Sequence, residues 1–106
     1  MIYVIATIQV RPQAREPMLR ELAAITPEVR QEDGCLEYRA AVDLSSGLPR
    51  QVPMRPDVVS VIESWRDFAA LNLHLTAPHM TQFRKRIADL VISTSLQILE
   101  ATDSEG

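Results

Sequence analysis

Two histidines and the only tryptophan lie between residues 63 and 83, and this segment is the part of the sequence best suited to chemistry. Trp65 ends an apolar run typical of a strand, and His74 and His79 flank a break between two helical patterns. A neutral imidazole can take a proton from a substrate, and an indole ring can stack against a planar molecule. Together at one end of a sheet, these groups would form a small-molecule site.

His79 is the favoured candidate for a base. Thr76 is expected to cap a helix that carries Pro78 in its first turn, which puts His79 near the third helical position. The positive end of that helix disfavours the imidazolium, so a neutral ring is expected. Each group also has a packing alternative: Trp65 as a core or interface aromatic, and His79 as a residue that only caps the turn. For His74 the packing interpretation is favoured.

Other side chains in the same region are weaker candidates. Glu63 shares a strand face with Trp65 and is a second possible acid or base, with a cross-strand ion pair as its alternative role. Candidates for contact with a substrate are two strand tyrosines that can point into the same space and two residues of an apolar helical stripe: Tyr3, Tyr38, Met80 and Phe83.

The sequence argues against a metal site. His74 and His79 are five residues apart, unlike the pair at i and i+4 of a zinc-binding helix, and no nearby carboxylate supplies an obvious third ligand. Cys35 is the only cysteine, which excludes an intrachain disulfide and a cysteine-rich zinc site. Neither a phosphate-binding loop nor a nucleophile triad is present.

Composition indicates one ordinary globular domain over residues 1–106, with 46% hydrophobic and 24% charged residues. The net charge of −3 argues against nucleic acid, which requires a basic surface. No apolar run approaches the roughly 20 residues of a membrane span, and the N-terminus is typical of a strand rather than a signal peptide. A cytoplasmic setting is therefore expected.

Alternating and helical patterns predict a βαββαβ order, the ferredoxin-like α+β fold. Strands are expected at 2–10, 35–43, 58–65 and 92–99. One helix follows Pro17, and a second helical region begins at residue 66 and breaks around residue 77. Residues 44–57 hold one glycine and three prolines and are expected to form a loop or arm, and residues 101–106 a flexible tail.

Two helical regions can cover only one face of a four-stranded sheet. The first and third strands nevertheless carry apolar residues toward both faces, and no segment is left to cover the second face. Pairing of two copies through their sheets is the economical solution, so a homodimer is expected. A pocket is then expected between the sheet and the helices of each subunit.

Three segments together resemble the antibiotic biosynthesis monooxygenase (ABM) family: EDGCLEY at 32–38, VIESW at 61–65 and HLTAPHM at 74–80. The arm and the closing LQILE at 96–100 are similar to its quinol monooxygenase branch. The resemblance implies a homodimeric α/β barrel that oxidises a small quinol or phenolic substrate with O₂, without metal, flavin or haem. Trp65 and His79 match family motif positions and would act as pocket wall and base.

The family is functionally diverse, so other roles stay open. Haem-degrading relatives use an asparagine on the first strand, and the strand IYVIATIQV has none, which weighs against haem degradation. A dimer that binds a small ligand without turnover is one alternative, and an isomerase of a small autoinducer-type metabolite is another.

Overall fold

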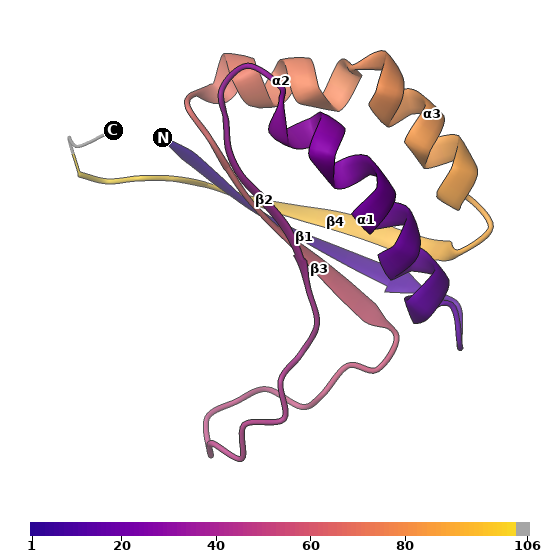
Figure 1. Ribbon diagram of the computed structural model, residues 1–106. Coiled ribbons are helices and arrows are strands. Elements are labelled where there is room, and N and C mark those ends of the chain that lie inside the picture. The colour runs from indigo at the N-terminus through magenta and orange to yellow at the C-terminus, as the bar shows by residue number, and fades with distance from the viewer. Residues whose placement is uncertain (104–106) are drawn as a thin grey trace.

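Four strands and three helices form the part of the chain that the computed structural model describes, residues 1–103 (Figure 1). In chain order they are β1 (Ile2–Val10), α1 (Arg15–Arg30), β2 (Cys35–Ala41), β3 (Val58–Trp65), α2 (Phe68–Thr76), α3 (Pro78–Ile87) and β4 (Val91–Glu100). The strands make one antiparallel sheet in the order β2-β3-β1-β4. All three helices lie against the same face of this sheet, which confirms the predicted ferredoxin-like fold (Figure 1).

Strand register decides which side chains face the helices. Val4 on β1 pairs with Glu63 on β3, which in turn pairs with Tyr38 on β2, so these three side chains share the covered face. From α1, the helical spacing expected from the sequence buries an apolar stripe against that face: Met18, Leu22, Ile25 and Val29. The core therefore lies between the helices and the covered face of the sheet.

The break between α2 and α3 differs from the sequence expectation in its capping residue. Thr76 is the last residue of α2, and its hydroxyl donates to the carbonyl of Asn72 at 3.2 Å. Ala77 is the N-cap of α3, and Pro78 occupies the first turn as expected. The predicted Thr76 cap is wrong because its hydroxyl already bonds the preceding turn, which puts His79 at the second position of α3.

No helix within residues 1–103 covers the other face of the sheet, which we call the open face (Figure 1). Tyr3 on β1 is 43% exposed there, and Leu99 on β4 is 41% exposed beside it. On β3 two serines, Ser60 and Ser64, interrupt the apolar residues of this face. The expectation of a third strand apolar on both faces is thus only partly correct.

Residues 42–57 form an arm without helix or strand that extends away from the sheet and helices (Figure 1). An ion pair closes its base: Arg55 Nη2 lies 2.7 Å from Asp43 Oδ1, and Arg55 Nε lies 2.9 Å from Oδ2. Beyond that pair the arm exposes apolar side chains, among them Leu44, Leu48 and Val52.

None of the helices in residues 1–103 is long and apolar enough to cross a membrane. Of the tail expected at 101–106, residues 104–106 lie outside the described residues.

Candidate functional site

A cavity of about 290 Å³ lies between the covered face of the sheet and the helices. Most of its wall is apolar and includes Met80 and Phe83 from α3, Leu75 from α2 and Leu96 from β4. Three buried polar side chains, Tyr38, Glu63 and His74, also line it. An apolar cavity with a few convergent polar groups is the usual form of a small-molecule site.

His74 is the most constrained of these polar groups. Its side chain is 2% exposed, and its Nδ1 lies 2.9 Å and 3.1 Å from the two carboxylate oxygens of Glu32. A carboxylate accepts hydrogen bonds, so Nδ1 carries the proton in this contact. Burial lowers the pKa of His74, although the Glu32 carboxylate opposes that shift. A neutral ring protonated at Nδ1 leaves a lone pair on Nε2.

The Nε2 atom of His74 has no hydrogen-bond partner within residues 1–103. Every fully buried side-chain nitrogen and oxygen in this part of the chain does have a partner. Nε2 must therefore reach open space, and the open space beside His74 is the cavity. The same reasoning applies to the hydroxyl of Tyr38 and to the second carboxyl oxygen of Glu63. The cavity thus presents polar atoms that a substrate hydroxyl can engage.

Glu63 is a buried carboxyl with an unusual affinity for its proton. Trp65 Nε1 donates to Glu63 Oε1 at 2.9 Å. The pKa of Glu63 is raised from 4.5 to about 7, chiefly by burial and in part by the neighbouring Glu32, while the Trp65 hydrogen bond works against both. A carboxyl that titrates near neutral pH in an apolar cavity can donate or accept a proton.

Trp65 is a buried neighbour of both Glu63 and His74. Its side chain is fully buried, and its ring lies 4.6 Å from the His74 ring, tilted by 33°. Tyr38 meets the same imidazole edge-on at 5.7 Å. Trp65 does not line the cavity, so the geometry gives it the core role that the sequence offered as an alternative, and the expected pocket wall is made by other residues.

His79 lies outside the cavity and contacts the same carboxylate as His74. Its Nε2 is 2.7 Å from Glu32 Oε2, its Nδ1 is 3.5 Å from Glu28 Oε2, and its side chain is 21% exposed. Glu32 was not among the predicted site residues, and it supplies next to both histidines the carboxylate that the sequence did not reveal. Even so, no group of three or more metal-binding side chains in residues 1–103 is arranged to hold a metal ion.

A tight turn between α1 and β2 brings Glu32 to the histidines. Gly34 in that turn has a φ of +85°, and a Cβ built on it would lie 2.5 Å from the Cβ of Ala70 on α2. Only glycine combines this conformation with so close an approach. The backbone N–H of Arg66 donates to the carbonyl of Gly34 at 2.8 Å, which ties the turn to the segment before α2.

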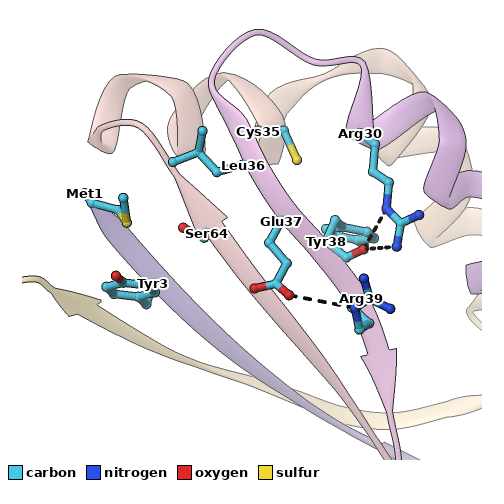
Figure 2. Close-up of a pocket in the computed structure, with 9 residues that line it drawn as sticks. All are labelled: Met1, Tyr3, Arg30, Cys35, Leu36, Glu37, Tyr38, Arg39 and Ser64. Atoms are coloured by element: carbon cyan, nitrogen blue, oxygen red, sulfur yellow. Dashed lines mark hydrogen bonds and ion pairs between the residues drawn. The ribbon is translucent and has the colours of Figure 1, made fainter. Parts of the chain in front are cut away.

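The structure places Tyr3 away from the cavity between the sheet and the helices. Tyr3 pairs with Ser64, the residue after Glu63 on β3. Because successive residues of a strand face opposite sides of the sheet, the Tyr3 side chain points to the open face. There it lines a second, more open hollow of about 490 Å³ together with Glu37 and Ser64 (Figure 2). The charged pair in that hollow, Glu37 and Arg39, is largely exposed, so it lacks the burial that suits acid–base chemistry.

Comparison with known proteins agrees with this geometry. The antibiotic biosynthesis monooxygenase family matches residues 1–86. The chain is 36% identical over 102 residues to "Probable quinol monooxygenase YgiN" of Escherichia coli K12, covering 94% of this chain and 97% of that protein. The solved structure of PA3566 from Pseudomonas aeruginosa superposes with a TM-score of 0.77 at 29% identity, covering 96% of this chain and 94% of that one. A Deinococcus radiodurans protein described under the same family name superposes with a TM-score of 0.81 at 26% identity, covering 100% and 97%.

Proposed function

Since this chain belongs to the antibiotic biosynthesis monooxygenase family, we propose that it oxidises a small quinol or phenolic substrate with O₂ and uses no metal, flavin or haem. The observation that carries the proposal is His74: a buried imidazole that lines an apolar cavity and has its Nδ1 2.9 Å from the Glu32 carboxylate. The name of the Escherichia coli relative supports the substrate class.

The chemistry explains why such a site can be sufficient. Dioxygen is a triplet and reacts slowly with closed-shell molecules, whereas a deprotonated quinol is electron-rich enough to give it one electron. The two radicals combine into a hydroperoxide on the substrate ring, and breakage of the O–O bond leaves a hydroxyquinone and water. Removal of the hydroxyl proton in a water-poor cavity is then the main task of the protein.

Proton balance favours His74 over His79 as the base. One quinol and one O₂ give one hydroxyquinone and one water with no net proton, so the base must return the proton that it takes. A base with little exposure to water keeps that proton available for the peroxide oxygen. The His74 side chain is 2% exposed and lines the cavity, whereas the His79 side chain is 21% exposed and does not.

Glu63 is the second group proposed to move a proton. Its pKa of about 7 leaves a substantial protonated fraction at neutral pH, so it can donate to the departing peroxide oxygen. Tyr38 keeps its proton, because burial raises its pKa, and it can orient the substrate through its hydroxyl. The apolar residues Met80 and Phe83 would contact the ring of the substrate.

Oxygen consumption with a panel of hydroquinones tests the proposal. Wild type should consume one O₂ per quinol, and His74→Gln should lower kcat by roughly 10²–10⁴-fold, the usual effect of a positioned acid or base. Leu73→Gln, an exposed change one residue away, is the matched control and should leave kcat unchanged. No turnover by wild type on any quinol, combined with saturable binding of those quinols, would favour the ligand-binding alternative and refute the proposal.

The absence of a cofactor is tested on the purified protein. It should be colourless, and elemental analysis should find metal far below one ion per chain. Turnover should also survive dialysis against a chelator, because the proposed chemistry relies on the substrate for its electrons. Haem, flavin or iron that co-purifies in stoichiometric amount would overturn this part of the proposal.

We also propose that two copies pair through their open faces. The open face holds exposed Tyr3 and Leu99, and the arm exposes Leu44, Leu48 and Val52, apolar side chains that pairing would remove from water. Sedimentation at micromolar concentration should give about twice the 11.9 kDa mass of one chain. A single species at the monomer mass would contradict the pairing.

A further inference from the structure

We propose that Glu32 and His79 are positioning residues that fix the tautomer and orientation of His74. The kinetic test of this inference rests on the proposed function, in which His74 is the base. The inference also has a spectroscopic test that needs no turnover. Neither residue touches the cavity, so neither is a catalytic residue in its own right.

The geometry centres on one carboxylate oxygen. Glu32 Oε2 lies 2.9 Å from His74 Nδ1 and 2.7 Å from His79 Nε2, and Oε1 lies 3.1 Å from His74 Nδ1. The two histidines come from different helices, and the carboxylate comes from the turn before β2. The break at Ala77 between α2 and α3 is what lets both rings converge on the same oxygen.

The tautomer of His74 decides whether it can act as a base. With the proton on Nδ1, held by Glu32, the lone pair on Nε2 is free toward the cavity. The opposite tautomer would put a proton on Nε2 and remove the basic site. When Nε2 takes a proton from the substrate, the adjacent carboxylate also stabilises the resulting cation. Glu32 thus contributes orientation before the proton transfer and charge stabilisation after it.

His79 restrains the carboxylate from the other side. A carboxylate bonded only by His74 could rotate and lose the nearly symmetric contact with Nδ1. The bond from His79 Nε2 to Oε2 opposes this rotation, and Pro78 in the first turn of α3 fixes the backbone from which His79 extends. The side chain is partly exposed, as suits a group that supports the site from outside rather than one that holds a substrate proton.

Glu28 provides a matched control. It is also a carboxylate next to His79, with Oε2 3.5 Å from Nδ1, but its side chain is 63% exposed and it makes no contact with His74. Glu→Gln at either position therefore removes one charge near His79, and only at Glu32 does it also remove the negative charge that His74 contacts.

The kinetic test compares Glu32→Gln with Glu28→Gln. Glu32→Gln should lower kcat roughly 10–100-fold, as expected for a partner that orients a working histidine, while KM changes little. Glu28→Gln should stay within about twofold of wild type, because exposed ion pairs contribute little. His79→Ala should also lower kcat, and His79→Gln, whose amide N–H can still donate to Glu32, should recover part of the loss.

The pH profile separates positioning from a general loss of structure. Glu32 raises the pKa of His74, so Glu32→Gln should move the acid limb of the kcat/KM profile to lower pH. The other charged or titratable groups around His74 are Glu63, Tyr38, His79 and Arg84, and all of them stay in place in this variant. Unaltered acid limbs in Glu32→Gln and His79→Ala would argue against positioning.

Nuclear magnetic resonance of the imidazole nitrogens tests the inference without turnover. The chain has only two histidines, so His79→Gln alone assigns both rings. Above the pH at which it titrates, His74 should be the Nδ1–H tautomer in wild type and in Glu28→Leu, and should lose that preference in Glu32→Leu, which leaves no side-chain oxygen for Nδ1–H to bond. An Nε2–H tautomer of His74 in wild type, or an unchanged tautomer in folded Glu32→Leu, would overturn the inference. Loss of activity in His74→Gln with full activity in Glu32→Gln and His79→Ala would also overturn it, while leaving the proposed base intact.

Discussion

The buried carboxyl of Glu63 should make the stability of this protein depend on pH in a direction opposite to that of most carboxylates. Burial raises the pKa of Glu63 from its ordinary 4.5 to about 7 in the folded chain. The folded state therefore holds this proton more tightly than the unfolded state does. The associated stability is fully present below about pH 4.5, falls as pH rises, and is lost once pH has passed about 7.

The size of the effect follows from the two pKa values. They differ by about 2.5, from 4.5 to about 7, and a difference of one in pKa corresponds to about 1.4 kcal/mol. Wild type should thus lose roughly 3 kcal/mol of unfolding free energy at this one group between pH 4.5 and pH 7.5. Glu63→Gln resembles the protonated carboxyl and can still accept from Trp65 Nε1, so it should not lose this contribution.

Guanidinium unfolding of both proteins at pH 5, 6, 7 and 8 measures the difference. Protein concentration must be the same in every series, because association changes apparent stability. Other groups titrate in both proteins and largely cancel in the comparison. Between pH 5 and pH 8, the stability of Glu63→Gln relative to wild type should rise by roughly 2.5 kcal/mol. Two parallel stability curves would refute the argument, because they would mean that Glu63 titrates alike in the folded and unfolded chain.

Three further outcomes can be checked by the same unfolding assay. Gly34→Ala should destabilise the chain by more than 1 kcal/mol beyond Gly47→Ala, because both glycines have positive φ but only Gly34 also meets a neighbouring Cβ; equal losses would contradict the close approach. Trp65→Phe should reduce stability by about 1–3 kcal/mol through the unpaired Glu63 carboxyl, and no loss would mean that water replaces the indole N–H. Asp67→Ala should reduce it by about 1 kcal/mol because Asp67 caps α2, and an unchanged midpoint would contradict that cap.

The fold could be predicted because its information is local in the sequence. The stripe of Met18, Leu22, Ile25 and Val29 has the helical period, and β1 lies within a run of β-branched residues, so each element is evident from its own residues. Element order then restricts the topology to very few arrangements. The Thr76 cap was wrong because a hydroxyl near a helix junction can bond backward or forward, and local pattern does not distinguish the two.

The site was only partly predictable because its central group is distant in sequence. Glu32 precedes His74 by 42 residues and His79 by 47. The spacing of the histidines does not indicate Glu32. The Asp33-Gly34 pair, which is typical of a turn, indicates only that the chain reverses next to Glu32. Tyr3 was misplaced for a related reason: strand alternation predicts two faces but does not say which one the helices cover.

The choice between the two histidines shows how tertiary charge overrides a local electrostatic argument. The sequence argument used the positive end of α3, a partial charge of about one half that weakens within a turn. The folded chain adds the Glu32 carboxylate, a full negative charge 2.7 Å from His79 Nε2. This contact occupies Nε2 of His79 with Glu32, and His79 does not line the cavity where a substrate would bind. His74 has the same partner but also lines the cavity, so we propose the buried ring rather than the exposed one as the base.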